Sequence, residues 1–156
     1  MSTYARLLKA LGSRRWFAAV ASRIAPPLDR LVYRASGGRR LATPDSVPTF
    51  FLTTTGRRTG RPRRVPVSFV VDDGDFVIVG TNWGKPATPE WALNLLANPR
   101  AFVEVDRNPV AIEARLILEE DRKAGWDALV AMWPPYAAYR ERAQGRDIAM
   151  FRLAKI

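Results

Sequence analysis

Apolar side chains recur at helical spacing through the first 35 residues of the chain. Between residues 3 and 35 they keep to one face of a helix, and basic side chains fill the positions between them. The pattern predicts a basic amphipathic helix, which Pro26 and Pro27 should end because proline lacks the amide donor that a helix needs. The apolar set is Tyr4, Leu7, Leu8, Leu11, Trp16, Phe17, Val20 and Ile24, and the basic set is Arg6, Lys9, Arg14, Arg15 and Arg23.

The pattern changes to strand-like segments after residue 46. The N-terminal helical segment, residues 1–46, ends in a loop over residues 36–45. One folded domain follows, residues 47–156. Asp72, Asp73 and Gly74 have the composition of a hairpin turn, so the strands around them should form an antiparallel meander. The predicted strands are residues 49–55, 64–71 and 76–80.

Helices and strands alternate in the rest of the chain. Thr88 and Pro89 should begin a helix that ends at Asn98 and Pro99, and a second helix should begin at Glu119. Further strands are predicted over residues 101–106, 110–118 and 148–153. This order predicts an α+β fold, a mainly antiparallel barrel with flanking helices and an N-terminal amphipathic helix.

The chain contains no Cys and no His. These absences exclude disulfides, zinc sites built from Cys or His, thiol nucleophiles and Ser-His-Asp relays, and we expect no metal site. An enzyme of this composition should take its bond-making chemistry from a bound cofactor, while the protein supplies binding and orientation.

Positive charge is concentrated in the first 64 residues. They hold 14 basic and 2 acidic side chains, whereas residues 65–156 hold 11 and 13. Such a field indicates an anionic partner, which can be nucleic acid, an acidic membrane or a phosphorylated ligand. Because no recognition-helix or zinc-finger pattern accompanies the charge, we expect no nucleic-acid partner.

The N-terminal helix has two interpretations. It can cap the barrel with its charges in solvent, or it can lie on an anionic membrane. The apolar run from Trp16 to Ala21 is too short for a signal peptide, and no segment reaches the roughly 20 apolar residues of a membrane span. We expect a cytoplasmic protein, with the inner face of the cell membrane as the alternative location.

Residues 53–64, TTTGRRTGRPRR, carry the densest positive charge. Gly56 and Gly60 allow a turn that aims N–H groups inward as an anion nest, while the surrounding guanidinium groups close on the anion's oxygens. The run matches neither a Walker A loop nor a G-x-G-x-x-G motif. The alternative is a solvated hairpin tip that is basic for solubility.

Tyr136 and Tyr139 stand three residues apart, after Trp133 and two prolines. If this segment is helical, both phenols share one face, where they can wall an aromatic ligand or donate hydrogen bonds. The alternative is ordinary packing. A third, weaker group near the end of the third predicted strand consists of Trp83, Lys85 and Trp91.

Four runs together resemble the deazaflavin-dependent nitroreductase family of the flavin/deazaflavin oxidoreductase superfamily, in its coenzyme F420-using branch. The resemblance extends from about Val47 to the C-terminus and implies a split β-barrel of the FMN-binding type. The chain departs from the family pattern at residues 81–84, TNWG, where Ser-Lys-Gly-Gly is frequent. The four runs are LTTTGRRTGRPR from Leu52, TPEWALNLLANP from Thr88, MWPPYAAY from Met132 and RDI from Arg146.

The resemblance also implies an activity and the residues that carry it. Hydride would pass from the reduced coenzyme to a quinone, an activated enone or a nitro-aromatic compound, and the basic loop would bind the coenzyme's phosphate and polyglutamate tail. Tyr136 would be the catalytic residue that orients the acceptor or donates a proton. The implied cofactor-binding residues are Thr54, Thr55, Arg57, Arg58, Arg63, Trp83 and Lys85, and the implied substrate-binding residues are Trp91, Trp133, Tyr136 and Tyr139.

Two related functions remain open on the same barrel. One is an FMN enzyme, because a single phosphate would also satisfy Arg57 and Arg58. The other is a non-catalytic or weakly catalytic relative that binds a lipid or quinone at the membrane. The sequence leaves open whether the protein is a monomer or a homodimer.

Overall fold

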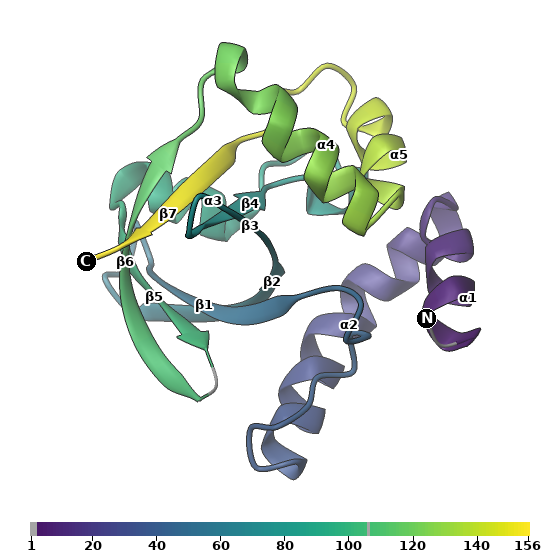
Figure 1. The fold of residues 1–156 in the computed structure, drawn as a ribbon, viewed down its shortest axis with the longest axis horizontal. Helices are drawn as coiled ribbons and strands as arrows, with labels where there is room; N and C mark the ends of the chain where they lie inside the picture. The colour runs from purple at the N-terminus through teal and green to yellow at the C-terminus, as the bar shows by residue number, and fades with distance from the viewer. Residues whose placement is uncertain (1–2, 106) are drawn as a thin grey trace.

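A curled antiparallel sheet organises the computed structural model, which describes residues 3–105 and 107–156 (Figure 1). Within these residues the sheet has seven strands in the order β2-β1-β5-β6-β7-β4-β3. Their bounds are β1 Thr49–Thr55, β2 Pro62–Ser68, β3 Val70–Asp72, β4 Asp75–Val79, β5 Arg100–Val105, β6 Asn108–Leu116 and β7 Met150–Lys155. The α+β class and the antiparallel barrel are therefore confirmed.

Helices flank the sheet at two places, near the edge formed by β4 and β3 and next to β2 at the opposite edge. Figure 1 shows α4 and α5 on the first side and the two N-terminal helices below α5. Their bounds are α1 Thr3–Gly12, α2 Arg15–Ala35, α3 Glu90–Ala97, α4 Arg122–Met132 and α5 Pro135–Arg142, with 3-10 turns η1 Asn82–Gly84 and η2 Glu119–Asp121.

The predicted strand over residues 64–71 is in fact two strands on opposite edges of the sheet. β2 pairs with β1 and β3 pairs with β4, and Phe69 stands between them. The Phe69 ring stacks on Phe50 at 4.5 Å and meets Phe76 edge-on at 5.1 Å. Because the chain passes from one edge to the other at this residue, the sheet curls into a barrel rather than staying an open meander.

The hairpin turn predicted before β4 is confirmed. Asp73 and Gly74 both have positive φ, 50° and 81°, as a two-residue turn between twisted strands requires. β1 has its predicted bounds, and the strands predicted over residues 76–80, 101–106, 110–118 and 148–153 are displaced by one or two residues. Asp106, the predicted end of the strand that became β5, lies outside the described residues.

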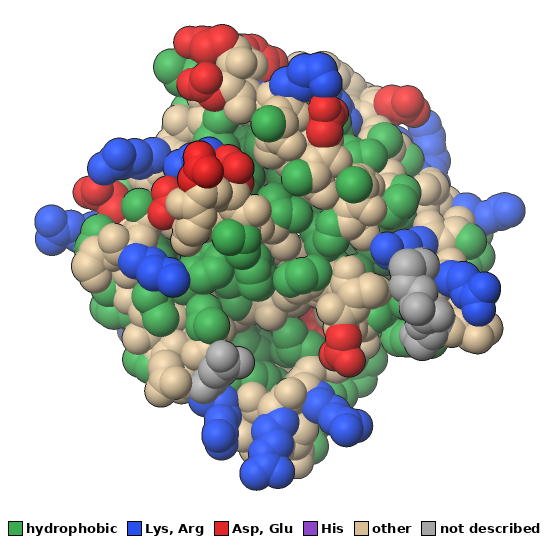
Figure 2. All heavy atoms as spheres, viewed as in Figure 1, with side chains coloured by type: hydrophobic (Ala, Val, Ile, Leu, Met, Phe, Trp, Pro, Cys, Tyr) green, Lys and Arg blue, Asp and Glu red, His purple; other side chains and the backbone are tan. Residues whose placement is uncertain are grey.

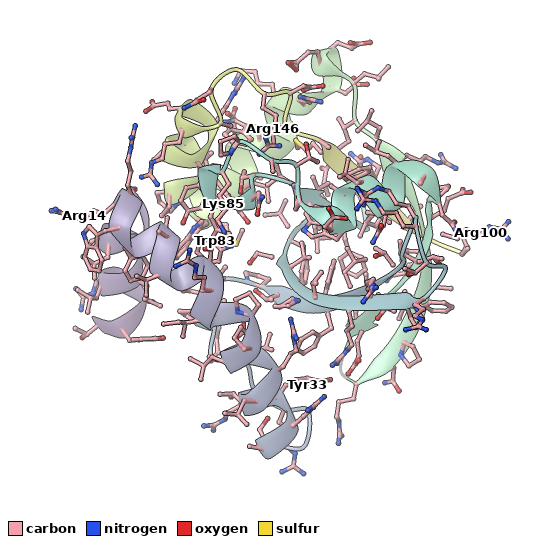
Figure 3. The ribbon with its side chains drawn as sticks, turned by 180° about the vertical axis from the view of Figure 1, so that it is seen from behind. Arg14, Tyr33, Trp83, Lys85, Arg100 and Arg146 are labelled. Carbon is pink, nitrogen blue, oxygen red and sulfur yellow. The ribbon has the colours of Figure 1, made fainter. Side chains whose placement is uncertain are left out.

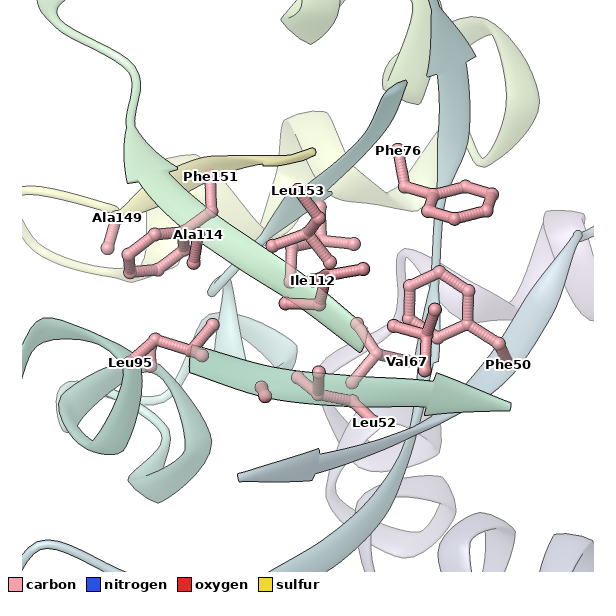
Figure 4. Close-up of a cluster of buried hydrophobic side chains, with 14 residues drawn as sticks. Phe50, Leu52, Val67, Phe76, Leu95, Ile112, Ala114, Ala149, Phe151 and Leu153 are labelled. Carbon is pink, nitrogen blue, oxygen red and sulfur yellow. The ribbon is translucent and has the colours of Figure 1, made fainter. Parts of the chain in front are cut away.

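Two apolar clusters share the sheet as a common wall. Side chains alternate along β4, so that Phe76 and Ile78 face the barrel interior while Val77 and Val79 face α4 and α5. The interior cluster is drawn in Figure 4, and its fully buried members include Leu52, Val103, Ile112 and Leu153. Each such side chain contributes about 1.5–3 kcal/mol by leaving water.

The prediction that Pro26 and Pro27 end the first helix is wrong. The break falls after Gly12, and α2 continues through both prolines to Ala35. A proline inside a helix costs about 3 kcal/mol, so tertiary contacts must hold the second half of α2. Asp29 is 3% exposed and accepts hydrogen bonds from the Thr43 amide and hydroxyl, both at 2.9 Å.

A second anchor holds the end of α2 to the sheet. The Tyr33 hydroxyl donates to Glu104, which also pairs with Arg64 at 2.8 Å, and the Tyr33 ring meets Phe51 edge-on. Burial and this hydrogen bond raise the pKa of Tyr33 from 10.0 to about 12. Residues on both sides of position 46 thus pack together, and the predicted boundary there stays a prediction.

The predicted helix at Thr88 begins slightly later than expected. Its N-cap is Pro89, without a side-chain cap, and the first helical residue is Glu90. The predicted end at Asn98 is confirmed, because Asn98 is the C-cap residue.

Candidate functional site

A cavity of about 360 Å³ lies between the barrel, α5 and the N-terminal helices. One wall comes from apolar residues of α1 and α2, and the facing wall comes from β2, η1, α3 and α5. The helix wall includes Leu8, Phe17, Ala21, Ala25 and Pro26, and the facing wall includes Val65, Ser68, Trp83, Trp91, Tyr136 and Tyr139. The N-terminal segment is therefore part of the cavity, which the sequence did not indicate.

Six of the predicted site residues gather at this cavity. They come from two segments that are far apart in the sequence, residues 83–91 and 133–139, and Figure 3 shows Trp83 and Lys85 close to α2. The six are Trp83, Lys85, Trp91, Trp133, Tyr136 and Tyr139. The other predicted residues, Thr54, Thr55, Arg57, Arg58 and Arg63, do not line it.

The tyrosine pair sits on one face of α5, as predicted. The Tyr136 and Tyr139 rings are 6.0 Å apart at 80°, and both residues are buried. Burial raises the pKa of each phenol, so both stay protonated at neutral pH. Interaction with the Ser68 side chain opposes this rise in pKa at Tyr136, and interaction with the Trp133 side chain opposes it at Tyr139.

The turn that carries Trp83 has an unusual backbone. Asn82, Trp83 and Gly84 all have positive φ, 49°, 59° and 77°, and such conformations cost free energy in residues other than glycine. At Gly84 a side chain would meet the Tyr139 backbone at 3.1 Å. This close approach places the Trp83 ring 6.0 Å from that of Tyr139.

Arg146 holds this turn through three backbone carbonyls, and sequence reasoning missed its role. Its guanidinium donates to the carbonyls of Gly80 at 3.2 Å, Thr81 at 3.0 Å and Lys85 at 3.3 Å. Figure 3 shows Arg146 beside Lys85 and Trp83. The only signal in the sequence was the RDI run that begins at this residue.

The basic loop after β1 does not form the predicted anion nest. The amides of Gly56, Thr59 and Gly60 donate to carbonyls within the loop at 2.8, 3.2 and 2.7 Å. The Arg57 amide donates to the Asn94 side chain at 3.0 Å. These four N–H groups are already satisfied, so recognition of an anion here rests on side chains.

The guanidinium groups of the basic loop differ in their surroundings. Arg57 pairs with Glu90, whose pKa the Arg57 hydrogen bond lowers. Arg58, Arg61 and Arg63 are exposed, and none of them forms an ion pair with an acidic side chain of the described chain. Three free cations at one hairpin tip can bind phosphate or carboxylate oxygens.

Helix α3 connects the basic loop to the cavity. On one side Asn94, which is 3% exposed, accepts from the Arg57 amide and donates to the Thr54 hydroxyl at 3.0 Å. On the other side Trp91 lines the cavity and packs against Phe151 at 6.1 Å. The same eight-residue helix thus sets the positions of both regions.

The molecular surface is basic at one end. Figure 2 shows Lys and Arg side chains gathered at the lower end of this view, where Figure 1 places the end of α2, whereas Asp and Glu side chains gather toward the top. Among the described residues, no group of acidic side chains could hold a metal ion.

Comparisons with known proteins give a consistent match. Residues 28–154 match the family model described as F420H(2)-dependent quinone reductase. An F420H(2)-dependent quinone reductase of Mycobacterium tuberculosis is 31% identical over 91 residues, which are 58% of this chain and 61% of that protein. This chain therefore spans less than two thirds of the length of that relative.

Solved structures share the fold. An F420-H2 dependent reductase, FDR-A, superposes with a TM-score of 0.62 and 32% identity over 69% of this chain and 94% of its own. A chain described as a domain-swapped dimer superposes with a TM-score of 0.64 and 29% identity, over 80% and 92% of the two chains.

Proposed function

The chain belongs to the F420H(2)-dependent quinone reductase family, and from this membership we propose that it is an oxidoreductase that reduces a quinone-class acceptor. The coenzyme, when bound in its reduced form, supplies the hydride. The observation that carries the proposal is the pairing of an aromatic-walled cavity with a cluster of unpaired guanidinium groups, held together by α3. Activated enones and nitro-aromatic compounds share the flat, electrophilic character of a quinone.

The residues present fit a ligand with a flat ring and an anionic tail. Arg58, Arg61 and Arg63 offer free cations to the tail, with Thr55 beside them at the end of β1. Trp83, Lys85 and Trp91 border the space for the ring. Arg57 and Thr54 support the loop through Glu90 and Asn94, so we assign them to positioning the loop rather than to direct contact.

Tyr136 supports the reaction as a neutral hydrogen-bond donor. Its burial raises the pKa of the phenol, so the proton is retained at neutral pH. As negative charge develops on the acceptor oxygen, a fixed donor at this wall stabilises it. Trp133 and Tyr139 complete the apolar wall and exclude water.

A fluorescence titration tests the proposal. Oxidised coenzyme F420 should bind at micromolar concentration or tighter, FMN should bind more weakly, and added salt should weaken the binding because the tail contacts are ionic. Reduced coenzyme should then be consumed when menadione is added. If neither coenzyme binds, the reductase proposal fails, and titration of a quinone alone decides whether the protein is a quinone-binding relative.

We also propose that the outer face of α2 contacts an anionic membrane. Trp16, Val20 and Ile24 stand four residues apart and are 59%, 49% and 54% exposed, which is unusual for a stripe of large apolar side chains. Exposed arginines, among them Arg15 and Arg23, border the stripe. No helix of the described residues is long and apolar enough to span a membrane.

Vesicle sedimentation tests this contact. Vesicles containing phosphatidylglycerol should sediment the protein, and vesicles of phosphatidylcholine alone should not. Replacing Trp16 and Ile24 by Glu should abolish sedimentation without a change in melting temperature, because both side chains are exposed. Equal sedimentation of the double variant would rule out this face as the contact.

A further inference from the structure

A second cavity, of about 810 Å³, lies next to the cavity described above. It opens between α4, the end of β6 and the loop that joins α5 to β7. None of the residues assigned above to the coenzyme or the acceptor lines it, but Val79 of β4 lines both cavities. A space of this size can hold a small organic molecule, and the side chains around it indicate the chemistry of that molecule.

Positive charge is in excess around the second cavity. Its wall has four basic and three acidic side chains. All three carboxylates are paired, whereas Arg140 and Arg146 form no ion pair within the described part of the chain. The paired groups are Glu119 and Asp147 with Arg122, at 3.5 and 2.9 Å, and Asp127 with Lys123, at 2.6 Å. The second cavity therefore favours an anionic ligand.

Trp126 supplies a flat surface beside the unpaired cations. Its side chain is half-buried, and the Arg140 guanidinium lies over its ring, 5.1 Å from the ring centre. Apolar side chains continue this surface, among them Ile148 and Leu118, which is 57% exposed. A cation next to an exposed apolar and aromatic surface matches a flat ring that carries a negative group, and a guanidinium fork matches a carboxylate best.

Arg146 connects the second cavity to the Trp83 turn. Its terminal nitrogens donate to three carbonyls of residues 80–85, whereas its Nε is buried and has no acceptor among the described residues. Burial lowers the pKa of this guanidinium, because its charge is desolvated without a bonded carboxylate. An anion bound nearby stabilises that charge and so acts on the side chain that holds the turn.

A second connection runs through the apolar core. Trp83 and Trp126 both pack against one buried cluster, which includes Val79 and Met150. These two residues face each other across β4 and β7, and both line the second cavity. A ligand that moves the Trp126 ring therefore presses on the same side chains that support Trp83.

We propose that the second cavity binds a flat aromatic carboxylate and that Arg146 transmits its occupancy to Trp83. The ring lies on Trp126, and the carboxylate lies beside Arg140 and Arg146. Because Trp83 borders the space assigned to the coenzyme ring, the site acts on the first cavity without sharing its ligands. The inference itself does not rest on the proposed function, since neither coenzyme nor acceptor takes part in it.

Indole N–H resonances test the site directly, with 1-naphthoate as the probe. The chain has five tryptophans, and a Trp→Phe variant of each assigns its resonance in ¹⁵N-labelled protein. Titration should shift the Trp126 and Trp83 resonances with one common Kd, and Trp91, which lines only the first cavity, should stay in place. The neutral 1-naphthalenemethanol should bind about 10-fold more weakly, because the charge-assisted contact is absent.

Two results of this titration would overturn the proposal. One is a Trp126 resonance that does not move. The other is a shift at Trp91 without one at Trp126, which would place the probe in the first cavity. Because the titration contains no coenzyme, either failure is distinct from a failure of the proposed function.

A matched pair of variants tests the contribution of Arg140. Arg140→Gln should weaken 1-naphthoate binding about 5- to 10-fold, the effect of one charge-assisted contact. Arg100→Gln removes the same charge at an exposed arginine that lines neither cavity and lies well apart from Arg146 in Figure 3, so it should leave the Kd unchanged. Equal losses in the two variants would mean that net charge alone attracts the probe, and the site would be refuted.

Arg146→Lys separates binding from transmission. Lysine keeps the positive charge but lacks the planar fork that reaches three carbonyls at once. In this variant 1-naphthoate should still shift the Trp126 resonance, and the Trp83 resonance should no longer follow it. A Trp83 shift of the same size as in the wild type would contradict the part assigned to Arg146.

Discussion

The basic loop and the tyrosine-walled cavity lie at the two sides of α3 and are built in opposite ways. The loop closes on itself through short-range backbone hydrogen bonds, and Arg58, Arg61 and Arg63 are exposed to solvent. The cavity is assembled from α1, α2, β2, η1, α3 and α5, and its key side chains are buried. The basic loop exposes charged side chains to solvent, whereas the cavity is lined by buried aromatic side chains.

This difference separates the two tasks of the proposed function. Exposed guanidinium groups attract an anionic tail over distance, but water and salt weaken each contact. The buried wall contributes little attraction over distance, yet it holds groups in fixed positions, which is what the chemical step requires. Substitutions in the loop should therefore change affinity, and substitutions around the cavity should change stability and turnover.

Substitution of Gly84 and of Gly60 by Ala should give the largest difference between the two regions in the free energy of unfolding. Gly84 and Gly60 both have positive φ, 77° and 67°, but a side chain at Gly84 would meet the Tyr139 backbone at 3.1 Å, whereas at Gly60 nothing lies within 4 Å. Gly84→Ala should cost about 2–4 kcal/mol from strain and crowding. Gly60→Ala should cost about 1 kcal/mol from strain alone.

Urea denaturation of both variants measures this contrast. The Gly84 variant should also lose menadione turnover in its folded fraction, because the Trp83 turn is displaced. Similar losses of stability at the two positions would mean that the cavity turn is no more tightly packed than the loop.

Asn94 joins the two regions, and its removal should affect both. Asn94→Ala leaves the Thr54 hydroxyl and the Arg57 amide without their partner, at a cost of about 2–3 kcal/mol. Coenzyme affinity should fall as the loop loses its support. Asn94→Asp keeps an acceptor for the Arg57 amide and should retain more of both properties. Unchanged affinity in the Ala variant would show that the loop does not depend on α3.

Removal of loop charge should change affinity alone. Arg58→Gln together with Arg63→Gln should weaken binding of coenzyme F420 about 10-fold, because two charge-assisted contacts are lost. The dependence of affinity on salt should become shallower. Arg39→Gln together with Arg40→Gln, at two exposed arginines in another loop, is the control for net charge. A comparable loss in that control would mean that the general positive field, not the loop, attracts the coenzyme.

Substitution of Tyr33 should have the smallest effect on stability, and that effect should depend on pH. The pKa of its phenol is raised from 10.0 to about 12, so the neutral form is favoured in the folded protein. The resulting stability is complete below pH 10 and is lost as the pH rises from about 10 to about 12. Tyr33→Phe should therefore show a smaller fall in melting temperature between pH 9 and pH 12 than the wild type does. A parallel fall in both proteins would contradict the raised pKa.

Prediction from the sequence succeeded where a signal is local. Strand β1 was predicted with its observed bounds, the turn at Asp73 and Gly74 has the expected backbone, and Tyr136 and Tyr139 share one helix face. Each of these features depends on residues within a few positions of one another. The helix through Pro26 and Pro27 was missed because contacts from Thr43 and Glu104, which are distant in sequence, offset a local penalty.

The sequence by itself determined most of the elements, the absence of Cys and His, and the chemical character of the basic loop and the tyrosine pair. Only the tertiary structure decided that the chain passes from β2 to β3 at Phe69, that α1 and α2 form one wall of the cavity, and that Trp83, Trp91 and Tyr136 line the same cavity. It also decided that Asn94 takes the Arg57 amide that an anion nest would need. The physical reason is that periodicity and turn preferences act over a few residues, whereas burial and hydrogen-bond partners depend on segments that meet only when the sheet curls.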